Sequence, residues 1–198
     1  MPRRERPTIA LLATHGAAAS VLYGMYDLFH SAGRDWPPMI GLPPGESAFH
    51  PLIVARDTAP LNVVNDIVVT PQVALRDLPA PDYICIPDLA IYPGDIALHG
   101  YEEEARWLRD CPARGSVIAA ACTGAMLLAE TGLLDGHDAT THWAYCDALA
   151  TRAIRYSERS CQLEPPPPIT SRWSGPAVTT TRCGCTRTLG WRVASASQ

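Results

Sequence analysis

Apolar and polar positions change in a regular order along the first 150 residues, and this order predicts strands that alternate with helices. Short apolar runs bounded by turn residues predict strands, and these are Thr8–Thr14, Met39–Leu42, Pro51–Ala55, Val63–Val69, Tyr83–Ile86 and Ser116–Ala121. Apolar residues at helical spacing predict helices, and these are Val21–Ala32, Tyr101–Arg109, Thr123–Thr131 and a last helix that starts at Thr141 and covers Trp143–Leu149. Ser20 is the predicted N-cap of the first helix, and Gly33 and Gly132 are predicted helix ends.

Two of the predicted strands are apolar throughout. Tyr83–Ile86 and Ser116–Ala121 show no alternation between apolar and polar positions. Such runs are typical of a parallel sheet that helices cover on both faces. Together with the strand–helix order, they predict an α/β fold, a doubly wound parallel sheet in a sandwich.

The pattern ends near Ala150. Residues 151–198 show no sustained apolar period and contain the run Pro165-Pro166-Pro167-Pro168, with one short strand expected at Ala177–Thr181. Residues 1–150 carry a net charge of −9, whereas residues 151–198 carry +5. We therefore expect a domain over residues 1–150 followed by an irregular, basic and truncated C-terminal part without a DNA-binding domain.

The abrupt change near Ala150 suggests two origins for the tail. All 16 basic residues of the chain are arginine and none is lysine, which is typical of a GC-rich coding sequence. A reading-frame shift near residues 148–160 of such a gene would produce Arg, Pro, Ser, Thr and Cys without apolar periodicity. The alternative is a natural basic tail that contacts nucleic acid or a partner.

Composition narrows the class of protein. The chain has 198 residues, of which 47% are hydrophobic, and a net charge of −4, which argues against direct nucleic-acid binding. No apolar run approaches the length of a membrane span. The apolar run Thr8–Ala13 behind Arg3, Arg4 and Arg6 is too short for a signal peptide, so we expect a cytoplasmic protein. The seven cysteines are irregularly spaced and odd in number, which favours reduced thiols, no metal site and no cofactor.

The sharpest local feature is the segment Val117-Ile-Ala-Ala-Ala-Cys122-Thr-Gly-Ala, in which an apolar strand leads through a cysteine directly into a helix. Small residues at Ala120 and Gly124 match the spacing of a nucleophile elbow. Cys122 is therefore a candidate nucleophile or sensor thiol, and the backbone N–H groups of Thr123 and Gly124 are candidates to stabilise an oxyanion. The alternative is a small buried thiol in a tight crossover.

Two longer segments carry a family resemblance. Ala121-Cys-Thr-Gly-Ala-Met-Leu-Leu-Ala-Glu-Thr-Gly-Leu-Leu-Asp-Gly136 and Ala139-Thr-Thr-His-Trp-Ala-Tyr145 resemble the ThiJ/PfpI superfamily, which is class I glutamine amidotransferase-like. Within it, the chain is most similar to the N-terminal domain of AraC-type transcriptional regulators, and Leu22-Tyr-Gly-Met-Tyr-Asp27 supports this subgroup. The resemblance covers about residues 8–150. It implies a flavodoxin-like fold, a homodimer and Cys122 at the elbow.

Two departures from the enzymatic members favour a ligand-sensing domain over a catalyst. Those members place an acid after the first strand, whereas this chain has His15-Gly-Ala-Ala-Ala-Ser-Val21. They also often carry Pro-Gly-Gly where this chain has Pro87-Asp88-Leu89. His15 and Asp88 remain candidate pocket residues together with His142, for which a structural role at the start of the last helix is the alternative.

Three functions follow from these residues. The first is a ligand-sensing domain of an AraC-type regulator that binds an unknown small molecule. The second is a cysteine-dependent enzyme, isonitrile hydratase-like or amidase-like, with Cys122 as nucleophile. The third is a redox-sensing thiol at the same residue.

Overall fold

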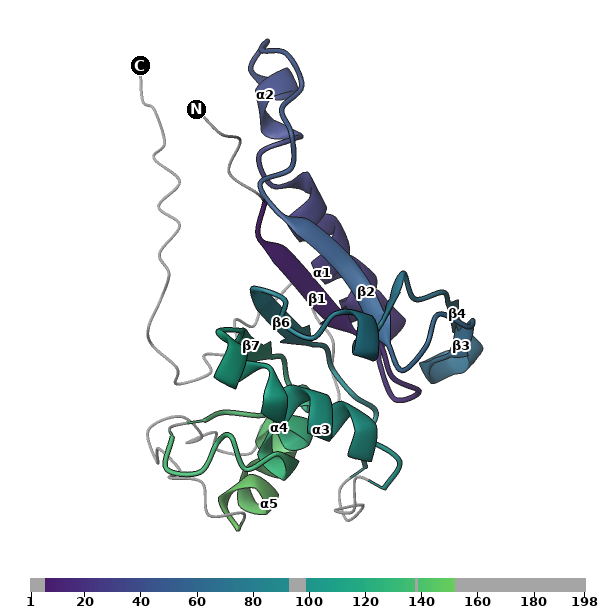
Figure 1. Ribbon diagram of the computed structural model, residues 1–198, viewed down its shortest axis with the longest axis vertical. Coiled ribbons are helices and arrows are strands. Elements are labelled where there is room, and N and C mark those ends of the chain that lie inside the picture. Colours follow the sequence, from purple (N-terminus) through teal and green to yellow (C-terminus); the bar gives the residue numbers. More distant parts are fainter. Residues whose placement is uncertain (1–5, 93–98, 138, 152–198) are drawn as a thin grey trace, which may run out of the picture.

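A five-stranded parallel sheet forms the centre of the protein (Figure 1). The computed structural model describes residues 6–92, 99–137 and 139–151. In the order of the sheet, the strands are β5 (Val73–Ala74), β2 (His50–Ala55), β1 (Thr8–Leu12), β6 (Tyr83–Ile86) and β7 (Val117–Ala120). Every pairing between neighbouring strands of this sheet is parallel. The predicted parallel α/β architecture is therefore confirmed.

Helices connect the strands and follow the last one. They are α1 (Ala19–Ser31), α2 (Trp36–Met39), α3 (Glu102–Asp110), α4 (Gly124–Glu130) and α5 (Cys146–Ala150). From β1 the chain passes through α1 to β2 on one side, and later through β6 and α3 to β7 on the other. The order of the sheet thus reverses beside β1. In sheets of this kind, ligands bind beyond the carboxyl ends of the strands at this reversal.

The core forms around β1. Ala10, Leu11 and Leu12 have no exposed surface, although their side chains point alternately to the two faces of the sheet. Both faces of the central strand are therefore covered, which explains why its sequence is apolar at every position. Leu22 of α1 and Leu108 of α3 are equally buried in the same core.

Strand β7 is more exposed than its continuous apolar sequence predicts. Val117 is 56% exposed, and Ala119 is exposed as well. Within the part of the chain that the structure describes, this edge strand is covered less than the apolar run predicted. Of the two strands for which the sequence predicts covered faces, β6 is buried over residues 84–86, whereas β7 is only partly covered within the described residues.

Three local predictions are also wrong. Val63–Val69 forms no single strand, because Asn65 and Asp66 have left-handed φ angles of 62° and 57° that turn the chain. The segment is instead a hairpin of β3 (Leu61–Asn62) and β4 (Val68–Val69) around a 3₁₀ turn. The strand expected at Met39–Leu42 is absent, since α2 and a turn occupy this stretch. Ser20 lies inside α1 rather than at its N-cap.

The remaining elements agree with the pattern. Helix α1 ends before Gly33 and α4 before Gly132, and both glycines have positive φ angles, of 79° and 77°. The last helical segment is a 3₁₀ turn over Trp143–Tyr145 that continues into α5. The basic tail predicted after Ala150, with its strand at Ala177–Thr181, lies outside the described residues.

None of the described helices is long and apolar enough to cross a membrane. Within the same residues, no three His, Cys, Asp or Glu side chains lie together in a way that could hold a metal ion.

An ion pair joins the end of β2 to α3. Arg56 donates from Nε and Nη2 to the two carboxylate oxygens of Glu104, at 2.8 Å and 2.6 Å. Glu104 is 3% exposed, whereas the Arg56 side chain is 42% exposed. Because a buried carboxylate without its partner is costly, this pair holds α3 against the carboxyl end of the sheet.

Breaking the pair from the arginine side should destabilise the fold. We expect Arg56→Met to lower the free energy of unfolding by about 1–3 kcal/mol, less than for a fully buried pair because Arg56 is half exposed. Urea denaturation of Arg56→Met, Glu104→Gln and the double variant measures the coupling between the two residues. The exposed pair Arg76–Asp77 is the control and should show no measurable coupling. Equal coupling in both pairs would contradict this interpretation.

Candidate functional site

Cys122 lies in a tight turn between β7 and α4. Its φ angle is 52°, a left-handed conformation that is uncommon for a residue with a side chain. The thiol is exposed, and the N–H of Ala121 before it donates to the carbonyl of Ile86 at 2.9 Å. The strand–turn–helix geometry around Cys122 thus agrees with the small residues that predicted it.

Gly124 allows α4 to start against the neighbouring strand. A Cβ atom at this position would lie 2.4 Å from the carbonyl oxygen of Pro87 and 2.9 Å from that of Ile86. Both neighbours are backbone atoms, which a side chain cannot displace easily. The N–H of Gly124 donates to the carbonyl of Ala121 at 2.8 Å, so the turn already uses the N–H group that the sequence assigned to an oxyanion.

The Thr123 hydroxyl ties the turn to the segment after β6. It lies 2.5 Å from Oδ1 of Asp88 and 2.6 Å from the carbonyl of Leu89, two acceptors for its single hydrogen. It also accepts the N–H of Leu89 at 3.0 Å. These contacts bring the Asp88 carboxylate beside Cys122, and the Leu89 N–H is used by the Thr123 hydroxyl.

The surroundings of Cys122 disfavour the thiolate form of its side chain. Partial burial raises the pKa of Cys122, and the charge of Asp88 together with its hydrogen bond to the thiol raises it further. The N–H of Thr123 donates toward the sulfur and opposes this shift. The net direction is upward, contrary to the lowering that a helix N-terminus alone would produce.

The segment before α5 contacts the turn at Cys122. The Thr141 hydroxyl donates to the carbonyl of Cys122 at 3.1 Å. The hydroxyl of Tyr145 donates to the carbonyl of Ile91. Burial raises the pKa of Tyr145, and the nearby Asp88 and Cys122 add to the shift. Cys122, Thr123, Asp88, Thr141 and Tyr145 therefore form one group, which we call the Cys122 cluster.

His142 lies at the start of the last helical segment, in the structural role that was the alternative in the sequence. Its Nδ1 accepts the N–H of Ala144 at 3.2 Å and caps the 3₁₀ turn. Its ring packs at an angle against Trp143 and edge-on against Tyr145, with centroids 5.3 Å and 5.9 Å apart. The described contacts of His142 are thus structural.

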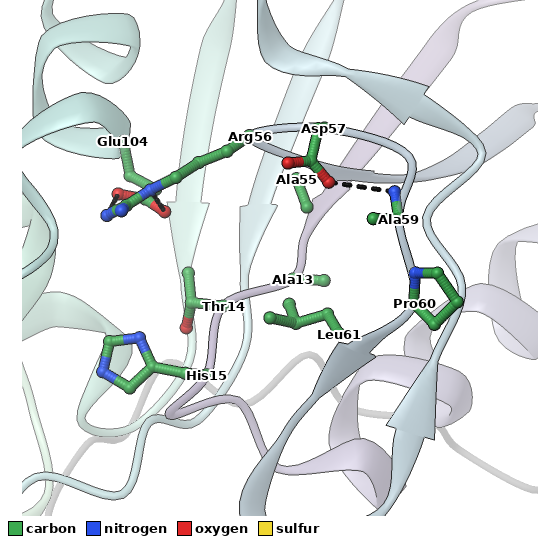
Figure 2. A pocket seen from close by; sticks show the side chains of 10 residues that line it. All are labelled: Ala13, Thr14, His15, Ala55, Arg56, Asp57, Ala59, Pro60, Leu61 and Glu104. Carbon is green, nitrogen blue, oxygen red and sulfur yellow. Dashed lines mark hydrogen bonds and ion pairs between the residues drawn. The ribbon is translucent and has the colours of Figure 1, made fainter.

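His15 lines a hollow beside the ends of β1 and β2 (Figure 2). Its ring stacks on Tyr101 with the centroids 4.6 Å apart. The hollow has a volume of about 260 Å³, and the Arg56–Glu104 pair forms part of its wall. The lining of this hollow includes no member of the Cys122 cluster, so the structure does not place His15 beside Cys122.

The sequence did not identify several residues of the Cys122 cluster and of the hollow beside His15 as site residues. Arg56 and Glu104 are separated by 48 positions, so no local pattern pairs them. Thr14 continues an apolar strand, and Tyr145 stands in a motif that was noted only for its histidine. One signal was available, since Arg56 follows a predicted strand directly, at the sheet end where ligands bind.

The close contact at Gly124 makes a clear prediction. We expect Gly124→Ala to lower the free energy of unfolding by about 1–3 kcal/mol, because the added methyl group overlaps two backbone carbonyls. Gly24 of α1 is the control, since a Cβ atom there meets nothing within 4 Å. Gly24→Ala should be neutral or stabilising. Urea denaturation of both variants decides, and equal effects would contradict the described packing.

The chain is similar to proteins of known function. Two curated relatives match half of the chain, over 99 and 102 residues. The isonitrile hydratase of Pseudomonas putida is 34% identical, and the HTH-type transcriptional regulator CdhR of Pseudomonas aeruginosa is 31% identical. The matches cover 42% and 28% of the length of these two proteins.

Among solved structures, a ThiJ/PfpI family protein from Pseudomonas syringae superposes with a TM-score of 0.61 and 23% sequence identity. This match covers 79% of the present chain and 58% of the other. It shows the same flavodoxin-like fold. The family model described as DJ-1/PfpI matches residues 45–181, more than half of the sequence. The chain belongs to the DJ-1/PfpI family.

Proposed function

We propose that this chain is the ligand-sensing part of a transcriptional regulator rather than a cysteine-dependent catalyst. The observation that carries the proposal is the environment of Cys122, where burial and the Asp88 carboxylate raise the pKa of the thiol. A catalytic cysteine needs the thiolate, which a neighbouring cation or base favours and a neighbouring anion disfavours. The similarity to the regulator CdhR also supports a role in a transcriptional regulator.

A second candidate function has its own support. The similarity to isonitrile hydratase and the proximity of Asp88 to the thiol favour an enzyme in which Asp88 takes the proton of Cys122. The sequence led us to expect no carboxylate beside the cysteine, because none follows β1. Asp88 approaches from the end of β6 instead, so this candidate needs a direct test.

We also propose that the protein is a cytoplasmic homodimer. Leu28, Trp36 and Met39 are 68%, 66% and 77% exposed, and they lie at the end of α1 and in α2. Large apolar side chains exposed in neighbouring segments are typical of a surface that another protein covers. Size-exclusion chromatography with light scattering tests this state, and a monomer at all concentrations would contradict it.

The position of Asp88 beside Cys122 predicts that replacing Asp88 changes the reactivity of the thiol. Replacing Asp88 by Asn removes a negative charge that disfavours the thiolate, so the pKa of Cys122 should fall and the thiolate fraction at neutral pH should rise. We expect Asp88→Asn to react faster with iodoacetamide at pH 7 than the wild type, as measured by mass spectrometry at Cys122. Asp77→Asn, at an exposed carboxylate in the 3₁₀ turn that follows β5, is the control. A slower reaction in Asp88→Asn would show that Asp88 activates the thiol.

A direct assay separates the two functions. An isonitrile hydratase adds water to an isonitrile and forms an N-substituted formamide. We expect this protein to form no formamide above the level of the Cys122→Ser variant. Turnover by the wild type that disappears in Cys122→Ser would overturn the sensing proposal in favour of the enzyme.

A further inference from the structure

The hollow beside β1 and β2 has features of a binding site that are independent of Cys122. It lies at the carboxyl ends of two central parallel strands, where α/β sheets bind ligands. Its volume of about 260 Å³ is just below the roughly 300–1,000 Å³ of typical small-molecule pockets. A compound of that size is smaller than a nucleotide.

Thr14 contributes a buried polar atom without a partner. The residue is 2% exposed, and its Oγ1 has no hydrogen-bond partner in the described part of the chain. A buried hydroxyl without a hydrogen bond is costly, and such groups are rare in folded proteins. Thr14 lines the hollow together with His15 (Figure 2). A polar ligand in the hollow would supply the missing bond.

Arg56 is held in place at the same end of the hollow. Nε and Nη2 donate to Glu104, and Nη2 also donates to the carbonyl of Gly100. Nη1 has no acceptor among the residues that the structure describes. A guanidinium fixed along one edge binds an acceptor without first losing side-chain freedom.

The remaining wall is apolar except for one carboxylate. Ala55, Pro60 and Leu61 line it and favour a hydrocarbon group. Asp57 also lines the hollow, and its Oδ1 accepts the N–H of Ala59 at 2.9 Å (Figure 2). The second oxygen of Asp57 remains for a donor on the ligand. Arg56, Thr14 and His15 lie on the side of the hollow opposite to Ala59 and Pro60 (Figure 2).

From this arrangement we infer that the hollow binds a small organic carboxylate with a short apolar tail. Arg56 Nη1 and the Thr14 hydroxyl donate to the carboxylate, and charge-assisted bonds of this kind are among the stronger ones in proteins. Glu104 and Glu103 lie along the other edge of Arg56, with Glu103 Oε2 3.9 Å from Nε, so Nη1 is the guanidinium nitrogen left to the ligand. An ammonium or hydroxyl group on the ligand would add a bond to Asp57. The inference deepens the proposed sensing function and rests on it for its biological role.

Three compounds of matched shape test the ligand class. These are 4-methylpentanoate, leucine, which adds an ammonium group to it, and 3-methylbutylamine, which lacks the carboxylate. We expect saturation-transfer NMR to show binding of the first two and not of the amine, with leucine bound at least as tightly as 4-methylpentanoate. Binding of the amine as tightly as the acids, or binding of neither acid, would overturn the inference.

Variants locate the site. Thr14→Val keeps the shape and removes the hydroxyl, so the affinity should fall about tenfold without loss of thermal stability, because the hydroxyl has no partner to lose. Thr14→Ser should retain binding. The double variant Arg56→Gln/Glu104→Gln leaves no unpaired buried charge and should abolish binding, whereas Arg76→Gln should not. Unchanged affinity in the double variant would place the ligand elsewhere.

One further variant separates this inference from the proposed function. Cys122 does not line the hollow, so Cys122→Ser should bind the acids as the wild type does. Turnover of an isonitrile with normal acid binding would refute the sensing function and leave the site intact. An unreactive thiol without acid binding would refute only the site.

Discussion

The approach of α4 to the end of β6 is the constraint on which the site depends. Gly124 lies so close to the carbonyls of Pro87 and Ile86 that no side chain fits between them. Because of this contact, Cys122 adopts a left-handed conformation at the tip of the turn, and Thr123 reaches the backbone of Leu89. The same approach brings Asp88 to the thiol. The packing that forms the turn therefore also determines the electrostatics of its cysteine.

An ion pair is the second interaction that shapes the carboxyl end of the sheet. The Arg56–Glu104 pair joins the end of β2 to α3, which follows β6 in the chain. The pair stabilises the fold and at the same time orients one edge of the guanidinium toward a hollow. Thr14, at the end of β1, adds an unpartnered hydroxyl. Two places at the carboxyl edge of one sheet thus carry different chemistry, a thiol whose pKa is raised and a hollow lined by Arg56 and Thr14.

The sequence predicted what local patterns determine. The continuous apolar runs identified β1, β2 and β6, because central strands of a parallel sheet are buried on both faces. Small residues around Cys122 identified its turn. The hairpin of β3 and β4 was missed, although Asn65-Asp66 is a typical turn pair that tolerates left-handed φ angles. Arg56–Glu104 and Asp88–Thr123 could not be predicted, because each joins residues at least 35 positions apart through the fold of the whole sheet.

The central claim is that Cys122 lies in the geometry of a reactive cysteine without its electrostatics. Titration of the Cys122 thiol against pH, followed by its thiolate absorbance with the Cys122→Ser variant as the blank, tests this claim most directly. Burial and Asp88 predict a midpoint above the ordinary pKa of a cysteine. A midpoint well below about 8.5 would contradict it, since the thiol would then be activated at neutral pH.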